Sequence, residues 1–297
     1  MFRLTSPQNP RIKEVVRLRQ GNYRRKVGRF LIDGQRETER AILGGFPVEE
    51  IFFCPDCADE ETWRWIDETE KMLTKFPSSG GVPEGRGGDF PPEEGNFVKF
   101  WEVPENIFGK MAYGEREDGV LAVARTVEKT LDEIWAELPR AKAVRMAILE
   151  GVEKPGNVGA ILRSADGAGI SAMIVTDPGT DLFNPNTIRA SMGTIFSVPI
   201  CVAEAETVPA WLAEHGITLF AARVDGAIPY FEADFRQPCA VAVGSEAWGL
   251  SDVFSGEGVQ AISLPMLGIS DSLNVSVTAG ILFYEMLRQR EFVVRSL

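Results

Sequence analysis

The chain has 297 residues, which is enough for one large domain or two ordinary ones. Hydrophobic residues make up 44% and charged residues 25%, as in globular proteins, and no apolar run approaches the ~18 residues of a membrane helix. Four cysteines argue against a disulfide framework. The net charge of −12 would by itself argue against a polyanionic partner.

The first 29 residues reverse that charge. They hold nine Lys or Arg and a single acid, Glu14, for a net +8, so the other residues carry −20. This density of cations suits phosphate neutralisation and predicts RNA contact, although a solvated helix face is the alternative. The candidate RNA-binding residues are Arg11, Lys13, Arg24, Arg25 and Lys26. The segment is Arg-rich like a transit peptide, but we expect it to belong to the mature fold.

Helices and strands alternate in the first half of the chain. Pro10 begins a helix, and residues 23–34 are expected as a basic loop that leads into a short strand. The remaining elements expected here are a helix over 37–43, a strand over 48–53, a helix over 62–76, and strands over 98–100 and 119–124.

The pair Cys54-Pro-Asp-Cys57 has the spacing of half a zinc site or of a redox pair. Cys201 and Cys239 are isolated, and His215 is the single histidine, so a tetrahedral ligand set would be hard to assemble. We therefore interpret the pair as part of a turn that follows a strand, and we expect no metal.

Residues 77–96 are rich in Pro and Gly and almost free of apolar side chains. Such a segment cannot bury a core, and we expect a flexible insertion without chemistry. The sequence then predicts an N-terminal domain over 1–125, a linker over 126–143 that is partly helical, and a C-terminal domain over 144–297.

The C-terminal half repeats a strand–helix pattern, which predicts a parallel sheet covered on both faces. Strands are expected over 146–149, 172–176, 195–202, 217–222, 240–243 and 261–264, and helices over 157–169, 187–193, 208–215 and 273–290. Ligands of such sheets bind beyond the carboxyl ends of the strands.

Generic nucleotide and hydrolase sites fit poorly. The first strand–helix turn, residues 150–159, lacks the glycine spacing of a dinucleotide fingerprint, and Pro155 would remove a phosphate-facing amide. A P-loop is absent from the sequence. A serine triad would need His215, which lies on an ordinary helix next to Gly216.

Three segments that follow strands carry the most specific signal. They are residues 157–165 (NVGAILRSA), residues 244–249 (GSEAWG) and residues 264–276 (LPMLGISDSLNVS). In this order they resemble the three signature motifs of the SpoU (TrmH-type) branch of the SPOUT RNA methyltransferases. The resemblance is close over 145–290 and looser over the N-terminal portion.

The resemblance implies an α/β fold in which a C-terminal parallel-sheet SPOUT domain with a deep trefoil knot follows a smaller α/β substrate-binding domain. It implies transfer of a methyl group from S-adenosylmethionine to a ribose 2′-hydroxyl of RNA, by a cytoplasmic enzyme. Ribosomal RNA is favoured over transfer RNA because the separate N-terminal domain resembles that of ribosomal RNA modifiers. The implied homodimer fits an apolar stripe on the last helix, at Ile281, Leu282, Phe283, Met286 and Leu287.

The cofactor would be held by backbone groups of the motif loops. Gly244, Leu264 and Leu273 end or follow strands, which leaves their main-chain groups free for the adenine. Gly244 and Gly268 also allow close approach of the backbone, and Met266 lies in the same loop.

Arg163 is the main catalytic candidate. Its guanidinium can bind the phosphate next to the target ribose and stabilise a developing alkoxide, whereas its high pKa makes it a poor base.

The other candidates carry alternative structural roles. Asn157 can cap its helix, contact the substrate, or do both. Glu246 can accept from Asn157 or hold a loop amide, or it can be a carboxylate favoured at a helix start. Ser272 and Asn274 can bind the ribose or Arg163, or cap the last helix. Trp248 is expected to pack at an interface rather than to stack on a base.

Two hypotheses from other classes remain for comparison. A non-catalytic RNA-binding or ribosome-assembly module would be favoured by loss of Arg163, Asn274 or the glycine turns, and all of these are present. A nucleotide-dependent enzyme on a Rossmann scaffold is disfavoured by the first strand–helix turn.

Overall fold

The computed structural model describes residues 1–297 except 76–96, 114–117, 140–143 and 292–297. The insertion expected over 77–96 therefore lies outside the described residues. Internal contacts divide the chain into two compact units. Unit 1 comprises Met1–Val127 and Phe183–Ser197, and unit 2 comprises Glu128–Leu182 and Val198–Leu297. The domain boundaries expected near 125 and 144 stay a prediction, and the sequence did not indicate that residues 183–197 pack with unit 1.

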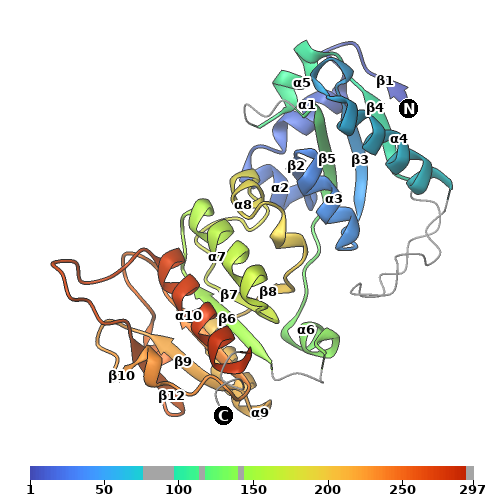
Figure 1. The fold of residues 1–297 in the computed structure, drawn as a ribbon. Coiled ribbons are helices and arrows are strands. Elements are labelled where there is room, and N and C mark those ends of the chain that lie inside the picture. The colour runs from blue at the N-terminus through green and yellow to red at the C-terminus, as the bar shows by residue number, and fades with distance from the viewer. Residues whose placement is uncertain (76–96, 114–117, 140–143, 292–297) are drawn as a thin grey trace. The chain divides into compact units, whose positions relative to one another are not determined.

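Unit 1 contains a five-stranded mixed sheet with the order β1-β4-β3-β5-β2. β4 is parallel to β1 and β3, whereas β5 is antiparallel to β3 and β2. The strands are β1 (Phe2–Arg3), β2 (Arg29–Asp33), β3 (Val48–Phe53), β4 (Lys99–Glu102) and β5 (Val120–Arg125) (Figure 1). The expected strands 48–53, 98–100 and 119–124 are confirmed within one or two residues.

The residues of unit 1 that the structure describes form six α-helices: α1 (Pro10–Arg17), α2 (Gly21–Val27), α3 (Gln35–Leu43), α4 (Glu60–Lys75), α5 (Glu105–Met111) and α8 (Pro185–Ala190). α1 begins as expected, with Pro10 in its first turn and the Asn9 side chain accepting from the Arg11 amide. α1 and α5 share one apolar core with β3 and β5, in which Val15, Ile107 and Phe52 are fully buried.

The expectation of a basic loop over the residues that precede β2 is wrong, because α2 occupies Gly21–Val27. This helix has no apolar stripe to reveal it, yet Arg and Lys have good helix propensity. Gly28 ends it in the left-handed conformation with a φ of 62°, and its amide donates to the Arg24 carbonyl.

Residues Phe183–Ser197 pack against unit 1 through aromatic rings. The Phe183 ring stacks on Phe30 at 4.3 Å between centroids, and the Phe196 ring meets Phe46 edge-on at 4.9 Å. The Arg40 guanidinium also donates to the Met192 carbonyl at 2.7 Å. These contacts make the segment part of the unit 1 core although it lies between two strands of unit 2.

Unit 2 contains a seven-stranded sheet in which every pairing is parallel, with the order β10-β12-β9-β11-β6-β7-β8. The strands are β6 (Arg145–Glu150), β7 (Ala172–Thr176), β8 (Ile200–Val202), β9 (Thr218–Ala222), β10 (Ile228–Pro229), β11 (Cys239–Val243) and β12 (Val259–Ser263). The predicted parallel α/β sheet is thus confirmed.

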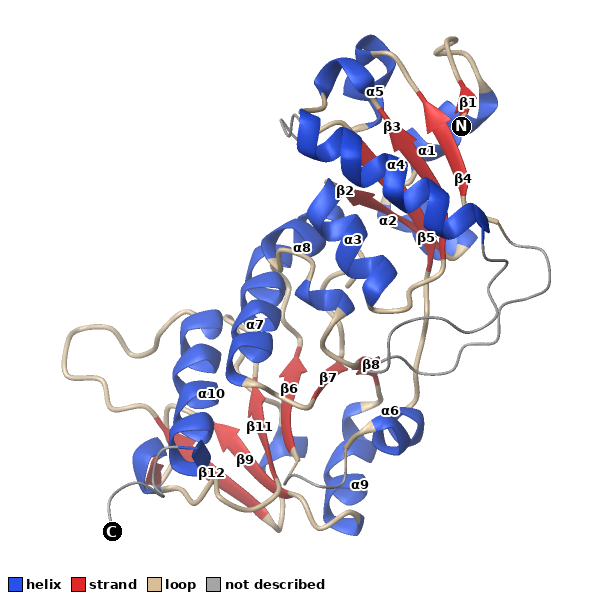
Figure 2. Ribbon diagram, turned by 45° about the vertical axis from the view of Figure 1, so that its right-hand side comes forward, coloured by secondary structure: helices blue, strands red, loops and turns tan. Residues whose placement is uncertain are grey.

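Helices cover both faces of this sheet (Figure 2). α7 (Pro155–Ala168) and α10 (Val275–Glu291) pack against each other on one face. α6 (Leu131–Glu137) and α9 (Val208–Glu214) lie on the other, where Ile134 and Leu212 join the core formed with Ile148 and Leu219. Among the described residues, we find no helix with the length and hydropathy needed to cross a membrane.

Two expectations for the C-terminal half are corrected. Residues 195–202 are not one extended strand, because a 3-10 turn over Thr194–Phe196 precedes the short β8. On α10, Leu282, Phe283 and Met286 are fully buried within the chain, so most of the apolar stripe is internal core rather than a free interface.

Gly119 offers a test of the unit 1 packing. Its φ is 68°, and an added Cβ would lie 2.6 Å from the Cys54 carbonyl oxygen. We expect Gly119→Ala to lower the free energy of unfolding by about 1–3 kcal/mol. Gly109 is the matched control, since it lies inside α5 with no atom within 4 Å of an added Cβ, and Gly109→Ala should stabilise by about 0.5–1 kcal/mol. Urea unfolding of both variants measures this, and equal effects would contradict the packing.

Candidate functional site

The first candidate loop joins β6 to α7. Lys154 is the N-cap of α7 and Pro155 its first residue, so Asn157 lies inside the first turn and does not cap the helix. The expected cap is therefore wrong, because Pro155 fixes the helix start two residues earlier. The Asn157 side chain is consequently free to bond elsewhere.

Asn157 joins the three candidate loops. Its side-chain amide donates to a carboxylate oxygen of Glu246, and its side-chain carbonyl accepts from the Asn274 amide at 3.3 Å. Glu246 follows β11 and Asn274 precedes α10, so residues 89 and 117 positions further along the chain meet at this point. We call these three residues the amide–carboxylate cluster. The bond from Asn157 to Glu246 was one of the alternatives open from sequence.

Asn274 serves the last helix as well as the cluster. Its side-chain oxygen accepts from the Ser276 amide at 2.9 Å and from the Ser276 hydroxyl at 2.6 Å. This is the N-cap arrangement that the sequence left open, and it fixes the direction of the Asn274 side chain. Ser272 is exposed and has no hydrogen bond with the described part of the chain.

The second loop is a tight hairpin after β11. Ser245 and Gly249 exchange backbone hydrogen bonds of 3.1 and 3.0 Å, and the Trp248 amide donates to the Ser245 hydroxyl. A Cβ on Gly244 would lie 2.1 Å from the Gly249 backbone, so glycine is required there by close approach. Trp248 itself is 88% exposed, and this leaves both an interface and base stacking open.

Glu150 supports this loop and was not identified from the sequence. It ends β6 with 5% exposure, and its two carboxylate oxygens accept from the Ser251 amide and hydroxyl, each at 2.6 Å. Charge-assisted bonds of this kind stabilise a loop more than neutral ones. The sequence signal that could have identified Glu150 is its position, as an acidic residue at the end of a strand that is otherwise apolar.

The third loop, residues 264–274, is open. Leu267 and Ile269 are fully exposed, Leu273 is 38% exposed, and Met266 is partly buried. Within the described chain, the main chain from Leu264 to Leu273 makes no backbone–backbone hydrogen bond. The loop thus offers free amide and carbonyl groups beside uncovered apolar side chains.

Arg163 lies on α7 but does not contact the cluster. Six residues separate it from Asn157, which corresponds to about 240° around a helix, so the two side chains leave different faces. The guanidinium is exposed and has no hydrogen bond or ion pair with any described residue. Its catalytic role stays a prediction.

The five basic residues singled out near the N-terminus fall into two groups. Arg24 is 4% exposed and donates to the Leu18 and Arg19 carbonyls, so it fastens the turn between α1 and α2. Arg11 donates to Glu50 at 2.6 Å and is paired with Glu14 as well. Because both guanidinium groups are already bonded within the chain, neither Arg11 nor Arg24 is available to bind a phosphate. The exposed ones are Lys13, Arg25 and Lys26.

Cys54 and Cys57 have their sulfur atoms 2.8 Å apart in a 3-10 turn after β3, the turn expected from sequence. Burial and the hydrogen bond with Cys54 raise the pKa of the Cys57 thiol to about 12, which disfavours the thiolate. No group of three or more His, Cys, Asp or Glu among the described residues could hold a metal ion.

Comparison with family models gives two matches. Residues 145–284 match a model described as the SpoU rRNA Methylase family, and residues 9–76 match one described as an MRM3-like substrate binding domain. The first span contains Asn157, Arg163, Glu246 and Asn274.

Individual relatives cover nearly the whole chain. The 23S rRNA (guanosine(2553)-2′-O)-methyltransferase RlmP of Bacillus subtilis (strain 168) is 26% identical, over 96% of this chain and 99% of its own. A crystal structure of an RNA 2′-O ribose methyltransferase is 35% identical, with a TM-score of 0.74 over 97% of this chain and 99% of that one. The structure of the SpoU methyltransferase AviRb from Streptomyces viridochromogenes, in complex with AdoMet, is 25% identical. Its TM-score is 0.76, over 95% of this chain and 98% of that one.

The bond between Glu150 and Ser251 yields a prediction about loop stability. Glu150→Ala removes both acceptor oxygens, so the amide and the hydroxyl of Ser251 lose their partners, and stability should fall by about 1–3 kcal/mol. Ser251→Ala keeps the backbone bond and should cost less. Urea unfolding of both variants tests the order of effects, and a neutral Glu150→Ala would contradict the assigned role.

Proposed function

The chain belongs to the SpoU rRNA methylase family, and we propose that it methylates ribosomal RNA at a site built on the amide–carboxylate cluster. It is an S-adenosylmethionine-dependent RNA ribose 2′-O-methyltransferase. The single observation that supports the location of the site is the meeting of Asn157, Glu246 and Asn274 from three separate loops. The carboxyl ends of parallel strands are where α/β sheets bind ligands.

The third loop fits the cofactor in chemistry. S-adenosylmethionine supplies an electrophilic methyl group on a sulfonium, and most of its remaining surface is apolar or neutral. Unbonded main-chain groups between Leu264 and Leu273 would serve the adenine, and the apolar side chains there would cover the rest. We propose backbone binding by Gly244, Leu264, Met266, Gly268 and Leu273.

The polar residues have complementary proposed roles. Asn157 and Asn274 are neutral hydrogen-bonding groups that can orient the ribose, and Glu246 holds the Asn157 amide. Ser272 is exposed next to them in sequence and can contact the same sugar. Arg163 would bind the adjoining phosphate and stabilise the developing charge on the 2′-oxygen, whose proton leaves to phosphate or water.

We also propose a homodimer and a trefoil knot in unit 2. The exposed position of Arg163 away from the cluster supports a dimer, since a second copy could bring this residue to the site. On α10, the side chains of Val277 and Tyr284 are 49% and 53% exposed. In the loop after β11, Trp248 is 88% exposed. Covering such side chains favours association. With ribosomal RNA as the substrate, we place the activity in the cytoplasm.

Transfer of labelled methyl from S-adenosylmethionine to ribosomal RNA tests the function. We expect label in 2′-O-methylated nucleosides after complete nuclease digestion, and calorimetry should detect cofactor binding. Label on the bases, or no heat at millimolar cofactor with and without RNA, would overturn the proposal.

Arg163→Ala tests the electrostatic role. Losing a donor aimed at developing negative charge costs ~10²–10³ in rate, and cofactor affinity should stay near that of the parent protein. Arg163→Lys keeps the charge but loses the planar fork, so it should be impaired too. Single-turnover methyl transfer measures both variants. The control is Arg64→Ala, at an exposed arginine of α4 in unit 1, which should react normally.

A further inference from the structure

The basic side chains of unit 1 differ in how much of their charge is already used. Arg11 and Arg29 are paired with Glu14 and other acids, at distances of 2.5–3.3 Å. Lys13 and Lys110 are exposed, and in the described chain the ammonium group of neither makes a hydrogen bond or an ion pair. These two lysines therefore keep a free ammonium group for an external anion.

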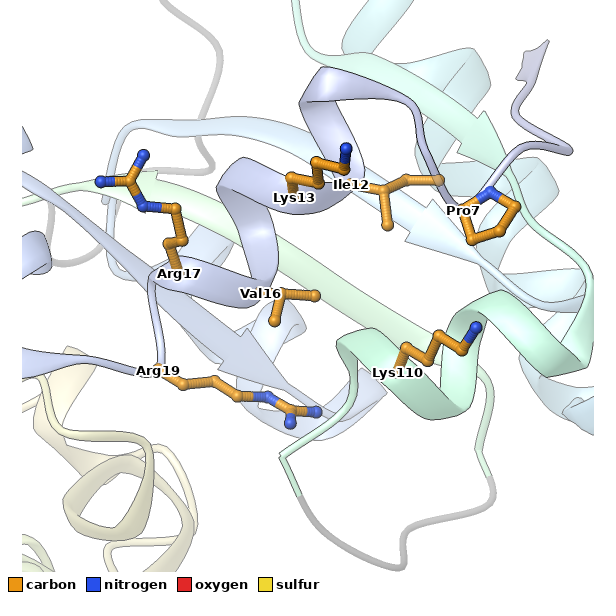
Figure 3. A pocket seen from close by; sticks show the side chains of 7 residues that line it. All are labelled: Pro7, Ile12, Lys13, Val16, Arg17, Arg19 and Lys110. Atoms are coloured by element: carbon orange, nitrogen blue, oxygen red, sulfur yellow. The ribbon is translucent and has the colours of Figure 1, made fainter.

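The two lysines border one pocket of about 510 Å³. It lies where α1 packs on α5, with Lys13 contributed by α1 and Lys110 by α5 (Figure 3). We call it the α1–α5 groove, and its lining residues are Pro7, Ile12, Lys13, Val16, Arg17, Arg19 and Lys110. Four of these seven are cations and none is an acid.

Local contacts hold the two arginines of the groove in place. The Arg17 guanidinium lies 4.2 Å from the centre of the Tyr23 ring, a cation–π contact, and the Arg19 guanidinium donates to the Ala112 carbonyl. Their charges are thus fixed near the groove at little further entropy cost. Ile12, with 2% exposure, and the partly buried Val16 give the groove an apolar floor.

Resting on the proposed function, we propose that the α1–α5 groove binds the RNA substrate, with phosphates on Lys13 and Lys110 and a ribose or base against Val16. Cations bordering an apolar surface match the alternation of phosphate and sugar–base units in an RNA strand. Residues 30–297 together carry −20 and would repel a polyanion, so this surface would also set where RNA first docks. An acidic peptide could satisfy the charges, but it would not be methylated.

The test is charge reversal with a matched control. Lys13→Glu combined with Lys110→Glu changes only exposed side chains, so folding should be retained. Arg64→Glu combined with Lys99→Glu, at exposed positions of α4 and β4, makes the same change in net charge outside the groove. Binding of a short single-stranded oligouridine is measured by fluorescence anisotropy over a range of salt concentrations. If the reversal unfolds the protein, Lys13→Gln with Lys110→Gln replaces it.

The groove variant should bind the oligouridine more weakly, with a salt slope lower by about two, one for each lysine, while the control keeps the parent slope. Equal losses in both variants, or no loss in either, would overturn the proposal. Polyglutamate serves as a second, peptide probe. If the groove variant loses binding of polyglutamate but keeps binding of the oligouridine, RNA is not the occupant.

Methyl transfer separates failure of the groove from failure of the proposed function. With ribosomal RNA as the substrate, the groove variant should show a raised KM and an unchanged kcat, because uniform substrate binding is lost. An unchanged KM beside an active parent protein would refute the groove alone. An inactive parent protein would refute the proposed function, whatever the variants bind.

Discussion

The Asn157 side chain is the interaction on which the candidate site depends. It is the one group that bonds to both of the other loops in the cluster, donating to Glu246 and accepting from Asn274. Parallel pairing of β6 with β11 brings the ends of these strands to one edge, and the amide then fixes the loops relative to each other. Glu150 adds a second tie to the segment after the hairpin. Without these bonds, the three loops would lie at the same edge of the sheet, but their positions relative to each other would not be fixed.

Sequence patterns predicted most of the fold because many of its strands are buried apolar runs, as at 120–124 and 172–176. They failed for α2, whose charged sequence lacks the apolar periodicity of a helix. They also failed for Phe183–Ser197, because its place in unit 1 depends on contacts with residues far away in the sequence. The meeting of the candidate loops was predicted, since the ends of parallel strands lie at one edge of the sheet, whereas their role as the site stays a prediction. The buried bonds of Glu150 could not be predicted, because they depend on how a distant loop folds back.

The basic residues of unit 1 have two roles: some bond within the chain, and others remain exposed at its surface. Arginines such as Arg11 and Arg24 are used internally, where a rigid fork bonding to carboxylates or carbonyls fastens helices and strands. Lysines, with flexible stems and strongly hydrated ammonium groups, are left at the surface. A count of basic residues therefore overstates the charge that a polyanion meets, because some of the arginines are already bonded within the chain.

The packing of Phe183–Ser197 into unit 1 also constrains how the chain matures. Phe30 is fully buried and stacks on Phe183, so the apolar centre of unit 1 is incomplete until the ribosome has made residues that follow β7. Domains usually fold in order as they emerge during synthesis. Here the core of unit 1 cannot be completed until its second segment, Phe183–Ser197, has been made. A partially made chain would expose the rings of Phe30 and Phe46 to chaperones or to aggregation.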